Sequence, residues 1–308
     1  MKHIFGPVPS RRLGSSLGVD IIPFKTCSYD CVYCQLSQTT CKTTERKEYI
    51  DSKSVISDLG AVLDEFEDPK SSLDYITFSG SGEPTLNSAI GKMVDEIKSF
   101  TDIPVAILTN GSLLYREDVR KELSNADIVI PSLDAVTQEV FEKINRPAPN
   151  LNIKEIIDGI RKFSESFDGK IWLEIMLVKG INDQAELDKI SKVIANLDVD
   201  KIQLNTVIRP PTEKYALPLD EKEMQKIKEK LGPKTEIIAQ FDRVKKKVYK
   251  KDIESKIFEM LQRRPATITD ISNSLSLHRN EAIKYIVQLT EEGRVKLIMH
   301  RGEKYYQA

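Results

Sequence analysis

Three cysteines, Cys27, Cys31 and Cys34, lie in one short segment with the spacing C-x3-C-x2-C. Because thiolates are soft ligands, three of them this close together can converge on one soft metal centre. In a four-iron cluster they would leave one iron without a protein ligand. The segment also lacks the fourth cysteine followed by proline that two-cluster ferredoxins use. The spacing therefore favours an iron–sulfur centre with one open iron.

A structural zinc site and a disulfide framework are the weaker alternatives. Zinc prefers four ligands, or three and a water. The chain offers only three histidines, two of them near its C-terminal end, and one further cysteine, Cys41. Four cysteines in 308 residues cannot staple a chain of this size. Cys41 is therefore expected to be a spare thiol.

A second segment with ligand-binding character is Gly80-Ser81-Gly82-Glu83-Pro84, which follows a short β-rich run at residues 75–79. Its small residues would let the backbone approach a ligand closely. An ordinary glycine- and proline-containing turn after a strand is the alternative. The cysteine triplet upstream favours the ligand-binding interpretation.

The two segments resemble the radical S-adenosylmethionine (SAM) superfamily. The triplet, with Tyr33 directly before its last cysteine, resembles the cluster loop, and residues 80–84 resemble the Gly-Gly-Glu-Pro turn, with Ser81 where a glycine often stands. The resemblance implies a [4Fe-4S] cluster whose open iron is chelated by SAM, with Glu83 and backbone carbonyls receiving the SAM ammonium. An electron from the cluster would then split the sulfonium and give a 5′-deoxyadenosyl radical.

Polar residues mark four later strands, and the resemblance extends to them. The strand at 105–109 leads into Asn110, and Ser132 and Asp134 follow the strand at 127–131. Together with the earlier segments, the implied SAM site comprises Tyr33, Ser79, Gly80, Gly82, Glu83, Pro84, Thr109, Asn110, Ser132, Asp134, Glu174 and Asn205. The implied metal ligands are Cys27, Cys31 and Cys34.

Glu174 is the one charged residue inside the apolar run 171–178. Such a carboxylate should face a ligand, a partner or the sheet edge, because burying it unpaired is costly. We favour a hydrogen bond to the SAM ribose, with a structural ion pair as the alternative.

The elements that would position these residues alternate between strands and helices. Strands are predicted at residues 18–24, 75–79, 105–109, 127–131, 170–178 and 201–207. Apolar residues recur at helical spacing in 52–66, 88–100, 116–123, 137–144, 152–167, 185–196 and 220–230. This order implies a parallel sheet with helices outside, and functional residues at strand carboxyl ends are typical of barrels. We predict an α/β fold: a partial (β/α)6 radical SAM barrel over residues 1–244, with a seventh strand at 235–241 as an option.

Residues 245–308 differ in character and resemble a winged helix-turn-helix domain. A basic linker at 245–251 precedes three helical patterns and a hairpin around residues 301–302. These residues hold 14 Lys and Arg against 8 Asp and Glu, a net charge of +6, whereas residues 1–244 carry −7. The charge favours nucleic-acid binding through Arg279, Asn280, Lys284 and Gln288, on the face away from the domain core. Many winged helices instead hold protein partners or pack on a neighbouring domain, and packing against a protein or the barrel is weighed slightly above nucleic-acid binding.

Composition fits a soluble cytoplasmic enzyme. Apolar residues make up 40% and charged residues 30% of the chain, which are ordinary globular values. The N-terminal segment lacks a signal-peptide pattern, and no apolar run is long enough to span a bilayer. An oxygen-labile cluster also needs a reducing compartment.

The predicted function is that of a radical SAM enzyme that abstracts hydrogen from an unidentified substrate. RNA, in particular tRNA, is favoured as substrate by the basic C-terminal part and by a resemblance to wybutosine-type tRNA modification enzymes. Activation of a glycyl-radical enzyme and peptide modification are alternatives, as is a DNA-binding regulator that senses its cluster or SAM. A flavodoxin- or ferredoxin-type electron donor is the expected partner.

Overall fold

The main sheet has eight strands and is mixed. The computed structural model describes residues 3–10, 12–239, 251–275, 277–300 and 303–308. Within them the strand order is β1-β2-β5-β6-β7-β8-β9-β10, with β1 antiparallel to β2 and the other neighbours parallel. The strands are β1 (Ile4–Ser10), β2 (Gly14–Val19), β5 (Tyr75–Phe78), β6 (Val105–Thr109), β7 (Ile128–Pro131), β8 (Lys170–Leu177), β9 (Lys201–Thr206) and β10 (Thr235–Ile237).

Two features of the sheet correct the prediction of six parallel strands. The optional seventh strand forms as β10, parallel to β9. The strand β1 is additional and makes the sheet mixed, because it pairs antiparallel with β2. It gives little sequence signal because it contains Pro7 and Pro9, which cannot donate to a strand ladder but are tolerated at a sheet edge. The strand predicted at 18–24 begins and ends earlier, as β2.

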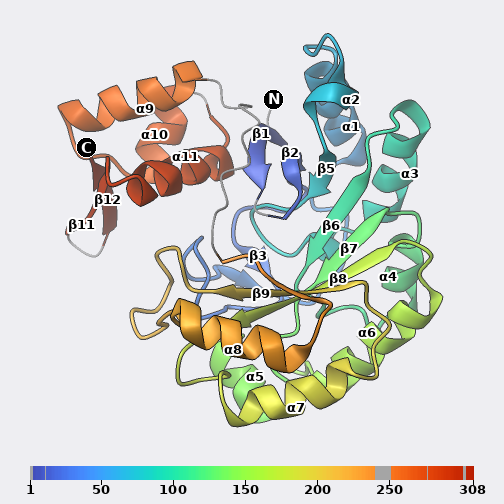
Figure 1. Ribbon diagram of the computed structural model, residues 1–308. Coiled ribbons are helices and arrows are strands. Elements are labelled where there is room, and N and C mark those ends of the chain that lie inside the picture. Colours follow the sequence, from blue (N-terminus) through green and yellow to red (C-terminus); the bar gives the residue numbers. More distant parts are fainter. Residues whose placement is uncertain (1–2, 11, 240–250, 276, 301–302) are drawn as a thin grey trace.

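Helices connect successive parallel strands and cover the outer face of the sheet, as the apolar spacing predicts (Figure 1). They are α1 (Ser52–Leu63), α2 (Pro69–Ser72), α3 (Ile90–Phe100), α4 (Glu117–Glu122), α5 (Gln138–Ile144), α6 (Ile153–Ser166), α7 (Ala185–Ile194) and α8 (Glu221–Leu231). Capping side chains fix the starts of some of these helices: Asp51 accepts from Ser54 N at α1, and Asp220 forms a capping box with Glu223 at α8. None of the helices in the described part of the chain is long and apolar enough to cross a bilayer.

The inner face of the sheet carries a second, smaller apolar cluster. Ala106, Ile128, Ile130 and Trp172 pack there with Leu13, which comes from the turn between β1 and β2. Because side chains alternate between the two faces of a strand, the neighbouring residues face the helices instead. The inner cluster forms an apolar floor, and polar side chains can gather above it.

The C-terminal part forms a separate unit with its own core. It consists of α9 (Lys251–Arg263), α10 (Ile268–Leu275), α11 (Arg279–Glu291) and the antiparallel pair β11 (Lys296–His300) and β12 (Glu303–Gln307). The core includes Ile257, Leu261, Tyr285, Ile286 and Leu289. This is the predicted order of three helices and a hairpin, while the winged-helix assignment stays a prediction. The predicted boundary at 244/245 and most of the basic linker lie outside the described residues.

Candidate functional site

One cavity opens at the carboxyl ends of the parallel strands, above the apolar floor. It has a volume of about 310 Å³ and is lined by the cluster loop, the turn after β5 and the ends of β6 to β9. Its lining includes Arg12, Lys25, Cys27, Cys31, Tyr33, Cys34, Gly80, Gly82, Glu83, Thr109, Asn110, Ser132, Glu174 and Asn205. The fold therefore brings together residues that lie up to 197 positions apart in the sequence, from Arg12 to Arg209.

Each of the three cysteine sulfurs lies next to a nitrogen donor. The pairs are Asn110 Nδ2 with Cys27 Sγ at 3.6 Å, Asn145 Nδ2 with Cys31 Sγ at 3.4 Å, and Lys25 Nζ with Cys34 Sγ at 3.4 Å. Cys41, in contrast, is exposed on the short strand β4 (Cys41–Lys42) and does not line the cavity. Donors directed at sulfur suit thiolates bound to a metal centre, because such sulfurs are strong acceptors.

The surroundings of the cysteines disfavour free thiolates. Burial, followed by the nearby Glu83, raises the pKa of Cys27 to about 12. Burial also raises the pKa of Cys31 well above its usual range, with Asp134 as the next cause. A bound cation reverses this preference, because metal-coordinated thiols are deprotonated. The three cysteines are therefore suited to hold a metal centre rather than to act as nucleophiles.

The arrangement of the thiols fits a cluster of several irons better than a single zinc ion. Among the described residues, no group of three or more His, Cys, Asp or Glu side chains is close enough to hold one metal ion. The three thiols instead surround one cavity. A centre with several irons suits such a set better than zinc, which needs three or four ligands within about 2.3 Å.

The turn after β5 packs directly against the cluster loop. Lys25 N donates to Ser81 O at 2.7 Å, and Glu83 N donates to Thr26 O at 3.2 Å. A Cβ atom on Gly82 would lie 1.8 Å from Thr26 O, so this position requires glycine. The small residues of the turn thus allow two close approaches, that of the cluster-loop backbone and that of a ligand.

Glu83 connects this turn to the end of β6. Its buried carboxylate accepts from Thr85 N at 3.0 Å, Thr109 Oγ1 at 2.6 Å and Asn110 N at 2.7 Å. Burial raises the pKa of Glu83, and the hydrogen bonds from Thr109 and Thr85 oppose that rise. Its Oε2 accepts from Asn110, and a carboxylate oxygen can accept a second hydrogen bond. Glu83 therefore fixes the turn and keeps capacity for a ligand.

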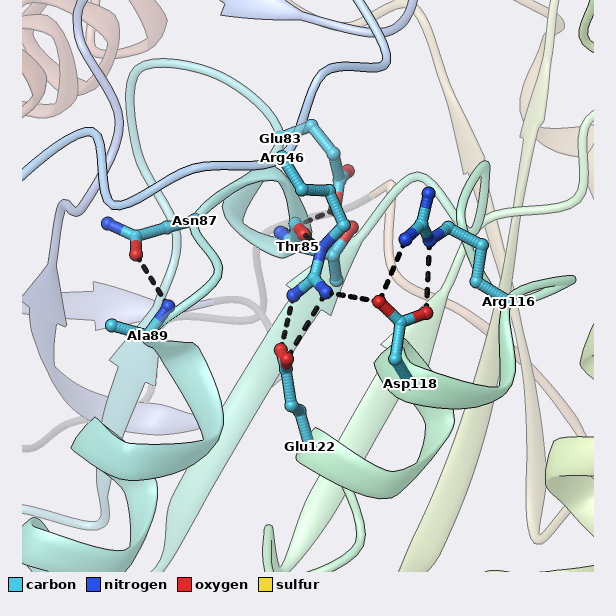
Figure 2. Close-up of polar contacts among 8 residues, drawn as sticks. All are labelled: Arg46, Glu83, Thr85, Asn87, Ala89, Arg116, Asp118 and Glu122. Atoms are coloured by element: carbon cyan, nitrogen blue, oxygen red, sulfur yellow. Dashed lines mark hydrogen bonds and ion pairs between the residues drawn. The ribbon is translucent and has the colours of Figure 1, made fainter.

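Figure 2 shows a second layer of contacts that supports Glu83 from outside the cavity. Arg46 Nε donates to Thr85 O at 2.8 Å, and its guanidinium forms ion pairs with Glu122 and Asp118 of α4. The Arg46 side chain is only 7% exposed. The turn after β5 is thus tied to α4 and to the chain segment that follows the cluster loop.

Asp134 lies behind the cavity wall and supports the cluster loop. It accepts hydrogen bonds from Tyr33 Oη, from Asn145 Nδ2 at 2.7 Å and from Met176 N at 2.8 Å. Burial raises the pKa of Asp134 to about 6, and the bonds from Tyr33 and Asn145 oppose that rise. Asp134 therefore orients Tyr33, which lines the cavity, and Asn145, which donates to Cys31.

Glu174 forms an ion pair inside the cavity. Arg12 Nη1 and Nη2 donate to the two oxygens of Glu174 at 2.7 and 3.0 Å, and Asn205 Nδ2 donates to Oε1 at 2.9 Å. The structural ion pair, which the sequence leaves as the alternative role, is thus present. Its partner comes from the turn between β1 and β2. The part of the chain built on the main sheet, residues 3–239, is called the barrel below.

The family follows from a direct comparison. A family model of the radical SAM superfamily matches residues 21–190, which include the three cysteines, the turn after β5 and Glu174. The chain belongs to the radical SAM superfamily. Members of this superfamily bind a [4Fe-4S] cluster and SAM, and these are the cofactors of the chain.

Relatives extend the match over the whole chain. UPF0026 protein MJ1312 from Methanocaldococcus jannaschii is 34% identical over 312 residues, 99% of this chain and 96% of that protein. A protein named GTPase Obg from Brachyspira hyodysenteriae is 40% identical over 299 residues, 96% of this chain, although the chain spans 43% of its length. GTP 3′,8-cyclase from Limosilactobacillus fermentum is 29% identical over 171 residues, 54% of this chain and 47% of that enzyme. Membership of the radical SAM superfamily indicates that this chain is an enzyme.

A solved structure shares the fold. The structure of TYW1 with a lysine–pyruvate adduct has a TM-score of 0.54 at 18% identity, and the match covers 70% of this chain and 72% of that one. At this identity the likeness concerns the fold alone.

Most of the residues implied by the resemblance to radical SAM proteins line the cavity, and three do not. Ser79, Pro84 and Asp134 lie beside it: Ser79 N donates to Val19 O, and Pro84 begins the 3₁₀ turn Pro84–Leu86. Two residues near the sulfurs, Lys25 and Asn145, are absent from the implied set. Lys25 could have been noticed as the basic residue two positions before Cys27. Asn145 stands in the segment Asn145-Arg146-Pro147, which resembles a segment that follows the fourth strand in several radical SAM proteins, but its place beside Cys31 depends on its contact with Asp134.

Proposed function

We propose that Cys27, Cys31 and Cys34 hold the [4Fe-4S] cluster and that this enzyme cleaves SAM reductively to remove a hydrogen atom from its substrate. The observation that carries the proposal is the set of three thiols around one cavity, each next to a nitrogen donor. The polar side chains at the ends of β6 to β9 line the same cavity, where SAM would bind.

In this proposal the chain contributes binding, orientation and shielding. The backbone of residues 80–83 and the second acceptor site of Glu83 Oε2 would receive the SAM ammonium. Asn110 and Ser132 would contact its carboxylate and ribose. Asn205 and Glu174 already share a hydrogen bond, and Glu174 is paired with Arg12. They would contact the ribose through oxygen atoms that can accept a further hydrogen bond from its hydroxyls. Leu108, Ile130 and Met176 form the apolar part of the wall and would exclude water from the reacting atoms.

When bound and reduced, the cluster supplies the electron that splits the SAM sulfonium and so provides the radical for hydrogen abstraction. A flavodoxin- or ferredoxin-type protein would deliver this electron. Lys25 Nζ and the amides of Asn110 and Asn145 would surround the cluster with positive charge and N–H dipoles, which favour the reduced, more negative form.

The substrate would enter through a larger cavity of about 1130 Å³ next to the cofactor cavity. The two share Gln35, Leu36, Val207 and Arg209, and the outer one is also lined by α11, β11 and β12 of the C-terminal unit. Lys304 of β12 donates to Pro211 O at 3.1 Å, and Thr212 donates to Cys34 O at 2.9 Å. The C-terminal unit would therefore contribute to substrate selection.

The identity of the substrate stays open between RNA and protein. The net positive charge of residues 245–308 supports RNA, for example tRNA. Exposed apolar side chains at the outer cavity, including Leu217 and Met299, suit a polypeptide as in glycyl-radical activation or peptide modification. A regulator that holds SAM without cleaving it would not need the outer cavity beside the cofactor site.

The deciding experiment measures SAM cleavage. Anaerobically reconstituted, dithionite-reduced enzyme should release 5′-deoxyadenosine from SAM, detected by liquid chromatography, with cell extract as a source of substrate. Cys41→Ala should behave as the wild type and Cys34→Ala should release none. A cluster-loaded protein that binds SAM and releases no 5′-deoxyadenosine would favour the regulator.

A further inference from the structure

Helix α11 lies against the edge of the barrel that is formed by β1 and β2 (Figure 1). The ring of Phe5 on β1 stacks on His278 with centroids 5.0 Å apart, and Lys284 Nζ lies 5.2 Å from the centre of the same ring. The guanidinium carbon of Arg279 lies 4.3 Å from the ring centre of Phe24. The face predicted to recognise nucleic acid is thus away from the core of its own unit, but it packs on the barrel.

Asp20, directly after β2, is the polar centre of this contact. Its carboxylate accepts from Ser81 N at 3.2 Å and from the Ser81 hydroxyl on the barrel side. From the C-terminal unit it accepts from Asn280 Nδ2 at 3.2 Å, and His278 Nε2 lies 3.4 Å away. Asp20 is 5% and Asn280 6% exposed, so the junction is shielded from water. One carboxylate therefore joins α11 to the turn that lines the cofactor cavity.

The position of Asp20 also constrains the backbone of that turn. Gly80 has a φ of +152°, and a Cβ atom there would lie 2.4 Å from the Asp20 carboxyl carbon. The turn and the carboxylate are thus in direct contact, with no space for adjustment. A displacement of Asp20 would therefore change Gly80 and Ser81, which both line the cofactor cavity.

The contact between the barrel and the C-terminal unit is suited to form and separate reversibly. Each part has its own apolar core, and a cavity of about 430 Å³ remains between them beside Asp20 and Ser81. The contact relies on polar and cation–aromatic pairs, and interfaces of this kind within a chain commonly permit relative motion. Docking and undocking of α11 would therefore form a two-state element.

We propose that docking of α11 onto Asp20 positions the turn at residues 80–83 for SAM, so that SAM binding and docking of the C-terminal unit favour each other. The inference rests on the proposed SAM site and adds the C-terminal unit as a determinant of its affinity. Coupling between two sites is reciprocal, so each event strengthens the other by the same factor. Asp20 and Asn280 act as positioning residues, because they touch the turn or each other rather than SAM, whereas Ser81 belongs to the turn itself.

The test uses full-length, cluster-reconstituted protein and SAM as the probe. Hydrogen–deuterium exchange of the peptide that covers α11 should slow when SAM is added to the wild type. Asn280→Ala should remove this protection and weaken SAM binding about tenfold in equilibrium dialysis, within the usual range of coupling. Ser81→Ala, which interrupts the link from the barrel side, should do the same. Gln288→Ala is the matched control, because the Gln288 amide donates to Glu292 of the same unit.

The outcomes separate this inference from the proposed function. The unfolding midpoint and the iron content of each variant are compared with those of the wild type. A variant that loses stability or iron has a structural defect, and its SAM affinity does not report on coupling. SAM binding that is equal in wild type and Asn280→Ala, with unchanged exchange in α11, would overturn the coupling and leave the proposed function intact. Failure of the cluster-loaded wild type to bind SAM would overturn both.

Discussion

Arg12 and Glu174 face each other across the inside of the barrel and form a two-point ion pair with N–O distances of 2.7 and 3.0 Å. Arg12 comes from the turn before β2, whereas Glu174 lies within β8. Their side chains are 11% and 13% exposed. The pair therefore links β2 and β8, the first and the fifth parallel strands, at the level of the cofactor cavity. These two strands are not neighbours in the sheet, so no strand pairing joins them there.

Removing one member of this pair should destabilise the fold. Glu174→Met leaves Arg12 uncompensated in a largely buried place, and breaking such a pair costs about 3 kcal/mol. Urea unfolding of the iron-free protein measures this directly. The double variant Arg12→Met plus Glu174→Met should recover a large part of the loss, because no unpaired charge remains. A loss in the double variant that equals the sum of the two single losses would show that the pair contributes little.

The same substitutions test the role of Glu174 toward SAM. If Glu174 also accepts a hydrogen bond from SAM, then Glu174→Met should weaken SAM binding by about 10- to 150-fold, the value of a charged hydrogen bond. Arg12→Met provides the comparison, because it removes the ion pair and keeps the carboxylate. SAM affinity that changes equally in both variants would assign Glu174 a purely structural role.

Iron content tests the cysteine ligands. Reconstituted wild type should contain about four irons and four sulfides per chain, as a four-iron cluster requires. Alanine at Cys27, Cys31 or Cys34 should abolish the cluster absorbance, whereas Cys41→Ala should keep it, because Cys41 is exposed and outside the cavity. Loss of iron from Cys41→Ala comparable to that from the other three would refute this ligand set.

The positive charge of Lys25 should raise the reduction potential of the cluster. Lys25 is only 3% exposed, and its amine lies 3.4 Å from Cys34 Sγ. Lys25→Met removes a charge that stabilises the reduced form, and we expect the midpoint potential to fall by roughly 60 mV, a tenfold change for one electron. Redox titration followed by electron paramagnetic resonance measures this. Lys42→Met, on the exposed strand β4, is the control and should leave the potential within error.

The sequence predicts the parallel core of the fold well, because local patterns determine it. β6 (Val105–Thr109) and α6 (Ile153–Ser166) lie where the apolar spacing places them. The ligand set is also local, since three cysteines stand within one loop. β1 escapes prediction because the stability of an edge strand with Pro7 and Pro9 comes from pairing with β2, which is a non-local contact.

The details of the site depend on contacts between distant segments. Glu174 has a recognisable character in its strand, but the sequence does not indicate that Arg12 is its partner, 162 residues away. Likewise, Asn280 has the pattern of an exposed helix residue, and it becomes buried only because α11 meets Asp20, 260 residues away. Periodicity identifies the face away from a local core and cannot say whether another part of the chain covers it.

Asp20 should make the stability of the protein depend on pH. Burial raises the pKa of Asp20 to about 6, and the donors from Ser81 oppose that rise. In the unfolded chain this carboxyl has an ordinary pKa of about 3.9, so it loses its proton at a lower pH there than in the folded protein. The contribution of Asp20 to the stability of the fold is therefore present below about pH 4 and is lost as the pH rises through 6. The loss should amount to about 3 kcal/mol at pH 7.

His278 titrates in the opposite sense and must be removed from the comparison. Burial, with the nearby His3, lowers the pKa of His278 to about 4. The contribution of the neutral imidazole to the stability of the fold is therefore present above about pH 6.5 and is lost as the pH falls through 4. We therefore compare two proteins that both carry His278→Gln, one with Asp20 and one with Asp20→Asn. Because only the protein with Asp20 loses stability as the pH rises, the free energy of unfolding of the Asp20→Asn protein minus that of the Asp20 protein should increase from pH 4 to 7. A difference that stays constant over this range would contradict the raised pKa.

The last prediction concerns nucleic acid and the basic face of α11. Arg279 and Lys284 lie over Phe24 and Phe5 of the barrel and are only half-exposed, so docking restricts their access to phosphates. In the full chain, Arg279→Ala plus Lys284→Ala should leave the affinity for bulk tRNA and its salt dependence nearly unchanged. The same change should lower the unfolding midpoint, because each cation–aromatic contact contributes about 0.5–1 kcal/mol.

A matched variant removes the same charge from a different surface. Arg263→Ala plus Lys296→Ala changes two exposed residues of the C-terminal unit and should lower any tRNA affinity at least as much. Each phosphate contact contributes roughly 0.7–0.9 to the slope of log affinity against log salt. A slope that falls by about two units in the Arg279 and Lys284 variant, and not in the matched one, would mean that α11 undocks to bind RNA. In that case the contact with Asp20 would oppose RNA binding, and SAM, which we expect to favour docking, should weaken it.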